Sequence, residues 1–114
     1  MLIYALIAFG IGAIGGLVLA NSVLRGQFAP WAISLLHAAL GATGLVLVGI
    51  AVMNGAANPA KLALGLLLVA ALGGFFLASF HLRKALPPKF VVVLHALLAV
   101  AGFVTLAGTA LQLV

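Results

Sequence analysis

Four long apolar runs, separated by short breaks, account for nearly all of this 114-residue chain. The runs cover roughly residues 2–24, 30–53, 61–83 and 88–112, so each supplies the ~20 residues that a helix needs to cross a hydrocarbon core of ~30 Å. The breaks contain only "RGQFAP", "NGAANPAK" and "RKALPPK". The sequence therefore predicts an all-α integral membrane protein, a single domain (residues 1–114) of four antiparallel helices in one bundle.

The composition supports a membrane environment and removes several classes of chemistry. The chain is 68% hydrophobic, and it contains no Asp, Glu or Cys. A water-soluble fold cannot build its surface from such a composition. Without carboxylates or thiols the chain has no acidic metal cluster, no disulfide and no cysteine nucleophile. The first run has full spanning length with no basic residue before it, which predicts an uncleaved helix rather than a signal peptide.

The few cations are distributed unevenly along the chain. Four of the five flank the first and third breaks, namely Arg25, Arg83, Lys84 and Lys89, and only Lys61 lies near the second. By the positive-inside rule the first and third breaks are cytoplasmic and both termini are not, as expected in a bacterial inner membrane. Lipid head groups, rather than nucleic acid, account for the charge of +5. We expect the bilayer, other membrane subunits or further copies of the chain as partners.

The two halves of the chain resemble each other. Residues 1–56 laid over 59–114, with a constant offset of 58, give sixteen identities, against about seven expected from composition. The only two arginines align, Arg25 with Arg83, and His37 aligns with His95. Each copy contains two spans, so both enter the membrane in the same direction. This predicts two parallel two-helix repeats, related by a pseudo-twofold axis along the membrane normal.

The repeat predicts where the two aligned histidines lie. Each follows its aligned proline by seven residues, in "SLLHAAL" and "VLHALLA", so both are expected ~10 Å deep from the same membrane face. The second and fourth helices of an up-down bundle lie diagonally across its centre. Inward-pointing His37 and His95 would therefore face each other and supply the two axial ligands of one haem iron.

Small and basic residues near the histidines suit such a cofactor. Gly41 and Gly44 follow His37 by one and two turns, and Gly102 follows His95 by two turns, so a flat macrocycle could approach the helices there. Arg25 and Arg83 end the first and third helices and are candidates to bind the two propionates, because an arginine fork binds carboxylates well.

This arrangement resembles the membrane b-type cytochromes, in which a four-helix bundle holds haem b between histidines of two helices. The resemblance rests on the pairing of His37 with His95, and it implies an electron carrier with a single bis-histidine haem. Because two histidines would fill both axial positions, electron transfer is favoured over oxygen binding. No residues for hydrolase or kinase chemistry are present, so we expect a carrier or a subunit rather than a stand-alone enzyme.

Other functions remain open at this stage. A quinone or a chlorin pigment could occupy the site instead of haem, and two histidines could each bind a separate pigment. The histidines could also be structural hydrogen-bonding contacts in a cofactor-free accessory subunit of a larger membrane complex. His81, which aligns with Val23, is expected at the membrane interface, where it could exchange protons with a quinone. Ser34 is expected to hydrogen-bond the His37 ring or its own helix.

Overall fold

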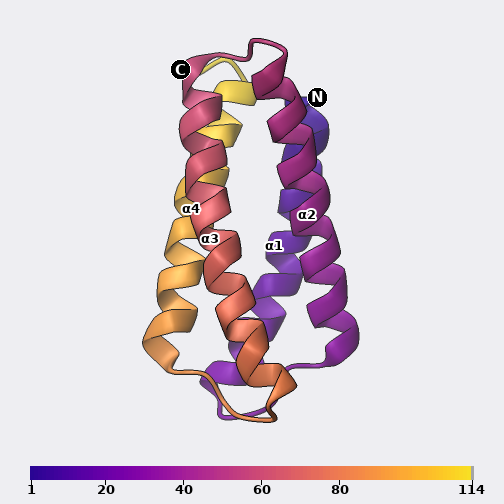
Figure 1. Cartoon of the computed structure of the whole chain (residues 1–114), viewed down its shortest axis with the longest axis vertical. Coiled ribbons are helices and arrows are strands. Elements are labelled where there is room, and N and C mark those ends of the chain that lie inside the picture. Colours follow the sequence, from indigo (N-terminus) through magenta and orange to yellow (C-terminus); the bar gives the residue numbers. More distant parts are fainter. Residues whose placement is uncertain (114) are drawn as a thin grey trace.

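Four helices form an elongated up-down bundle in the computed structural model, which describes residues 1–113 (Figure 1). The helices are α1 (Leu2–Leu24), α2 (Trp31–Met53), α3 (Asn58–Leu82) and α4 (Lys89–Ala110). All four are long and apolar enough to cross a membrane. Their outer surfaces carry large apolar side chains, such as Leu17, Leu97 and Phe90 at 71, 62 and 72% exposure. These features indicate an integral membrane protein, as the composition predicted.

The helix boundaries follow the local chemistry of the breaks. Pro30 and Pro88 immediately precede α2 and α4 in an extended conformation, which suits residues that cannot donate a backbone hydrogen bond. The third helix begins at Asn58, three residues before the predicted start. Pro59 stands in its first turn, where the missing N–H costs nothing. Hydropathy predicted the apolar span, whereas the helix extends beyond that span into polar residues.

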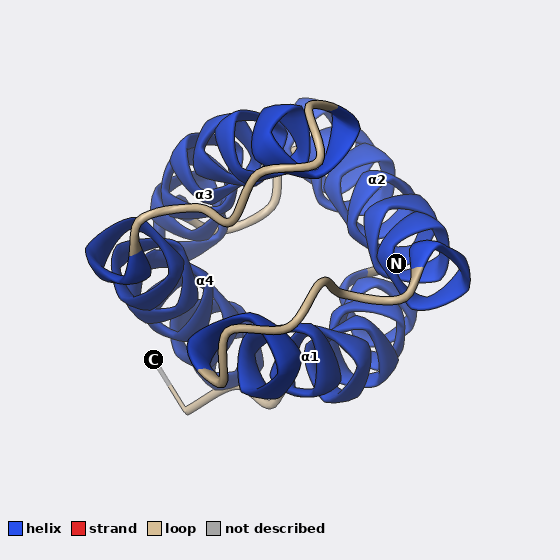
Figure 2. Cartoon of the chain, turned by 90° about the horizontal axis from the view of Figure 1, so that it is seen from below, coloured by secondary structure: helices blue, strands red, loops and turns tan. Residues whose placement is uncertain are grey.

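Each helix pairs most closely with the one that follows or precedes it in the same half of the sequence. Thus α1 packs along α2, and α3 packs along α4, with smaller contacts between α1 and α4 and between α2 and α3. The view along the bundle shows the order α1, α2, α3, α4 around the axis (Figure 2). Helices α2 and α4 therefore lie on a diagonal, as predicted.

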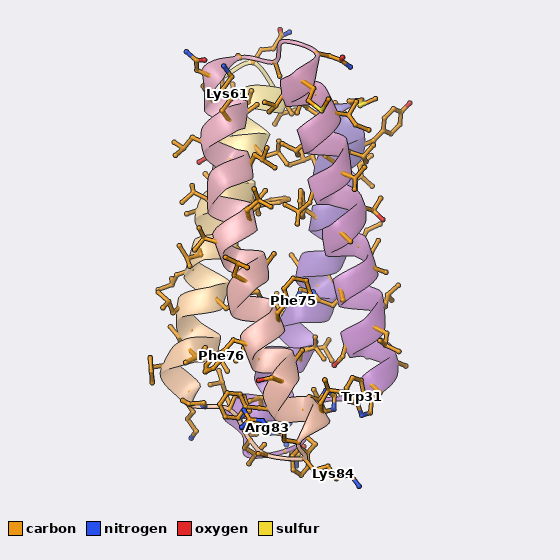
Figure 3. The ribbon with its side chains drawn as sticks, viewed as in Figure 1. Trp31, Lys61, Phe75, Phe76, Arg83 and Lys84 are labelled. Carbon is orange, nitrogen blue, oxygen red and sulfur yellow. The ribbon has the colours of Figure 1, made fainter. Side chains whose placement is uncertain are left out.

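The apolar core is concentrated at one end of the bundle. Leu106 and Val48 are the largest fully buried side chains, and they form a cluster with Ala5, Ala63 and Leu67. These residues lie towards the end that holds the termini and the 54–57 loop. The other end, formed by the 25–30 and 83–88 loops, carries Arg83 and Lys84, with Lys61 at the far side (Figure 3). We call this end the basic end. It is loosely packed: in the two turns of α2 and of α4 nearest to it, Val92 is the one buried side chain among the described residues.

Candidate functional site

His37 and His95 make equivalent hydrogen bonds to the backbone of the neighbouring helix. The Nδ1 atom of His37 lies 2.8 Å from the carbonyl oxygen of Gly12, and the Nδ1 atom of His95 lies 2.7 Å from that of Ala70. Both acceptors are related by the same offset of 58 as the histidines. A carbonyl oxygen can only accept, so Nδ1 donates its proton in both rings. In a neutral imidazole this leaves Nε2 unprotonated and able to bind a metal.

Glycines on the neighbouring helices make room for the two rings. A Cβ atom at Gly16 would lie 2.9 Å from Cε1 of His37, and one at Gly74 would lie 3.2 Å from Cε1 of His95. Gly15 and Gly73 lie against the same two side chains. The aligned glycine pairs therefore allow each imidazole to lie close to the neighbouring helix, where it reaches the carbonyl oxygen.

The two histidine rings meet across the bundle, although their helices are diagonal. Their ring centres are 6.3 Å apart and the ring planes are inclined by 78°. Both side chains are partly buried. The structure therefore brings the two aligned histidines together, with their ring centres 6.3 Å apart.

The three candidate glycines of α2 and α4 have different surroundings. A Cβ at Gly44 would lie 2.5 Å from Cζ of Phe9, and one at Gly102 would lie 2.7 Å from Cγ of Leu67. Phe9 and Leu67 are themselves related by the offset of 58, so these two glycines receive matching side chains of the neighbouring helix. The position of a Cβ at Gly41 has no neighbouring atom within 4 Å. Of the three, Gly41 is the one that adjoins open space.

The two arginines lie at the basic end, and Arg83 folds back along its own helix. Its Nε atom donates to the carbonyl oxygen of Ser79 at 3.2 Å, and its guanidinium lies 4.6 Å from the centre of the Phe80 ring. Arg25 ends α1 at the equivalent position and is exposed. In this conformation the Arg83 guanidinium contacts Ser79 and Phe80 of its own helix rather than the two histidines.

Ser34 has a different partner from those that the sequence predicted, and His81 makes a contact that the sequence did not predict. The Ser34 hydroxyl lies 3.4 Å from Nδ1 of His81, so its partner is neither His37 nor its own helix. The His81 ring stacks on the indole of Trp31, with ring centres 3.8 Å apart and an interplanar angle of 7°. Sequence reasoning missed this contact, because it joins the start of α2 to the end of α3 and the two repeats carry different residues there.

The described part of the chain contains no cluster of three or more His, Cys, Asp or Glu side chains that would hold a bare metal ion. The candidate site therefore consists of two imidazoles and depends on a further group to complete any metal coordination. Comparisons with protein-family models, with curated proteins and with solved structures found no match to this chain.

Substituting Gly16 by alanine is expected to displace the His37 ring. The new methyl group would lie 2.9 Å from Cε1, closer than the contact distance of ~3.5 Å, while the ring is held by its bond to Gly12. The matched variant Gly74→Ala meets His95 at 3.2 Å and should perturb it less. The test is the imidazole NMR spectrum of each variant. Equal shifts in both variants, or none for Gly16→Ala, would contradict this account.

Proposed function

We propose that this chain is a membrane electron carrier of the b-type cytochrome kind, with one haem held between His37 and His95. The observation that carries the proposal is the distance between the two imidazoles. A metal–imidazole bond of ~2 Å, with ~1.1 Å from nitrogen to ring centre, puts the centres of two opposed ligands about 6 Å apart. The observed separation of 6.3 Å has that length. Ligation also requires that both Nε2 atoms point into the space between the rings.

The hydrogen bonds of the histidines also support metal ligation. Histidines that bind a metal through one nitrogen commonly donate the other N–H to a backbone carbonyl or a carboxylate, which fixes the tautomer and the ring orientation. His37 and His95 both have this arrangement through Nδ1. The carbonyl oxygens of Gly12 and Ala70 would increase the basicity of the two Nε2 atoms.

The distribution of side-chain bulk suits a flat group at the level of the histidines. Gly15, Gly16, Gly73 and Gly74 bring bare backbone to the two rings. Gly41 adjoins open space one turn away. The tightly packed cluster around Leu106 and Val48 lies towards the opposite end. The glycines of α1 and α3 therefore make room for the imidazoles, and Gly41 leaves space beside them.

A bound haem would supply a one-electron redox centre inside the bilayer. The chain's own residues would hold it: the two Nε2 atoms as axial ligands, and Arg25 and Arg83 as counter-charges for the propionates. For this role Arg83 must exchange its contacts with Ser79 for a carboxylate, a stronger acceptor for a guanidinium. With both imidazoles bound, a small substrate would be kept from the metal, so the expected activity is electron transfer with a lipid-soluble or protein partner.

An absorption spectrum tests the proposal directly. The chain purified from haem-replete cells is expected to carry one haem per chain, and to show the sharp bands of a six-coordinate b-type haem on reduction. A colourless preparation that also fails to bind added haemin in detergent would overturn the proposal.

A cofactor-free accessory subunit is the second candidate, and one observation favours it. The Nδ1 bonds of His37 and His95 already join the two helices of each hairpin without a metal. Co-purification separates the two functions. If the unsubstituted chain and a His37→Ala, His95→Ala variant associate equally with a large membrane complex, and neither is coloured, the accessory role holds.

A further inference from the structure

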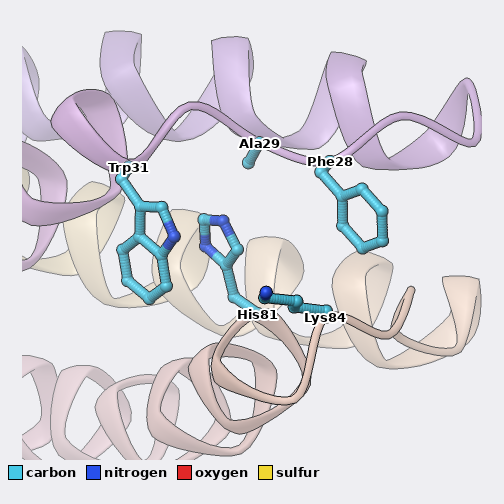
Figure 4. Close-up of a pocket in the computed structure, with 5 residues that line it drawn as sticks. All are labelled: Phe28, Ala29, Trp31, His81 and Lys84. Carbon is cyan, nitrogen blue, oxygen red and sulfur yellow. The ribbon is translucent and has the colours of Figure 1, made fainter.

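The two halves of the chain differ in chemistry at a pocket of the basic end. The pocket has a volume of about 240 Å³ and is lined by Phe28, Ala29, Trp31, His81 and Lys84. His81 comes from the end of α3 and Lys84 from the 83–88 loop, and the other three residues come from the 25–30 loop and the start of α2 (Figure 4). By the offset of 58, the positions equivalent to His81 and Lys84 hold Val23 and Gly26. The two basic side chains of the pocket thus belong to the second repeat only.

His81 is held in a defined orientation within this pocket. Its ring stacks on Trp31 with ring centres 3.8 Å apart, and Nδ1 lies 3.4 Å from the Ser34 hydroxyl. When Ser34 donates to Nδ1, the proton of the neutral ring lies on Nε2, which is then a hydrogen-bond donor. Positions equivalent to Trp31 and Ser34 hold Lys89 and Val92. The contacts that orient His81 are therefore also specific to this side of the bundle.

Lys84 occupies a backbone conformation that normally selects glycine. Its φ angle is +55°, and at the equivalent position of the first repeat Gly26 has a φ of +76°. Both residues follow the C-cap of a helix, and a side chain there is strained whereas glycine is not. The second repeat therefore accepts backbone strain at the position where it places a cation beside His81.

The groups of this pocket suit an anion. Lys84 supplies an ammonium group and His81 supplies a ring N–H, while Phe28 and Trp31 provide apolar walls. The sequence has no Asp or Glu that could neutralise the lysine. The side chains of the chain therefore supply no negative charge to this pocket, and an anion from another molecule would meet no acidic competitor there.

We propose that this pocket binds a phosphate group, either that of an anionic lipid or free phosphate. The pocket lies at the end of helices long enough to span a bilayer, where head groups concentrate and attract basic residues. Its volume of about 240 Å³ is below the ~300–1,000 Å³ of sites that enclose a whole small molecule. It therefore fits a head group whose remainder stays outside. The site includes neither His37 nor His95, and its test needs no haem.

Fluorescence of Trp31 can report binding, because it is the only tryptophan of the chain. The purified protein in neutral detergent would be titrated with short-chain phosphatidylglycerol, with the matched phosphatidylcholine, and separately with inorganic phosphate. We expect a saturable change in emission with phosphatidylglycerol and little with phosphatidylcholine, whose phosphate is neutralised by its own cation. Saturation by the lipid alone identifies a head-group site, and saturation by inorganic phosphate as well identifies free phosphate as a ligand.

Two variants and one matched control make the result specific. Lys84→Gly restores the residue of the first repeat and relieves the strained backbone, so the variant should fold, and its affinity should fall about fivefold. His81→Val, again the residue of the first repeat, should weaken binding similarly. Lys61→Ala removes the same charge at the opposite end and should bind normally. The proposal is overturned by an equal response to both lipids, by no response, or by equal losses in Lys61→Ala and Lys84→Gly.

Discussion

Replacing His95 by alanine is expected to remove haem from the purified chain almost completely. The substitution deletes one of two proposed axial ligands and leaves the carbonyl oxygen of Ala70 without its donor. Loss of a residue that only orients a metal ligand weakens metal binding ~10–100-fold, so loss of the ligand should exceed that range. The measurement is the ratio of haem to protein after purification, from the absorbance of the reduced chain.

The same measurement separates one shared macrocycle from two independent pigments. A shared haem predicts that His37→Ala and His95→Ala each lose all of the colour, whereas separate pigments predict that each loses half. His81→Ala is the control, since its ring contacts Trp31 and Ser34 rather than the histidine pair, and it should keep its full haem content. A His95→Ala chain with the haem content of the unsubstituted protein would exclude His95 as a ligand.

The pairing of the histidines could be predicted from the sequence because it depends on symmetry rather than on side-chain detail. A repeat fixes equal depth, and an up-down bundle places α2 and α4 on a diagonal, so the two rings had to meet if they pointed inward. The structure brings their centres to 6.3 Å. The carbonyl acceptors could not be predicted, because every residue has one and only the helix register selects Gly12 and Ala70. The spacing Gly12-x-x-x-Gly16, typical of close helix contact, was the available signal.

The surroundings of single residues were less predictable, because they also depend on how neighbouring helices are placed against each other. Gly44 and Gly102 were candidates for cofactor contact because of their spacing from the histidines, yet the structure packs them against Phe9 and Leu67. Which glycine faces a neighbouring side chain depends on how two helices are rotated about their axes. Each of the four helices is apolar on all sides, so its sequence does not indicate which side faces the bundle centre. The stack of His81 on Trp31 depends likewise on a contact between the two repeats.

Substituting Leu106 by alanine should destabilise the bundle more than the same change on its lipid-facing surface. Leu106 is fully buried in the packed cluster, whereas Leu97 on the same helix is 62% exposed. In water a buried Leu→Ala change costs ~2–5 kcal/mol. In a bilayer the transfer part of that cost is small, because lipid is as apolar as leucine, so the loss of packing contacts remains, about 2 kcal/mol. Leu97→Ala should change the free energy of unfolding by less than ~0.5 kcal/mol.

Val48 provides a graded comparison, because it is the equivalent of Leu106 in the first repeat and is also fully buried. Val48→Ala removes fewer atoms and should cost about 1 kcal/mol. Unfolding in mixed micelles of increasing SDS fraction, followed by circular dichroism, gives the order of the three variants. Equal losses for Leu106→Ala and Leu97→Ala would mean that the cluster is not the stabilising core. Because Leu106 lies eleven residues, ~16 Å, from His95 along α4, Leu106→Ala should keep its haem, and stability and cofactor binding would then depend on opposite ends of the same bundle.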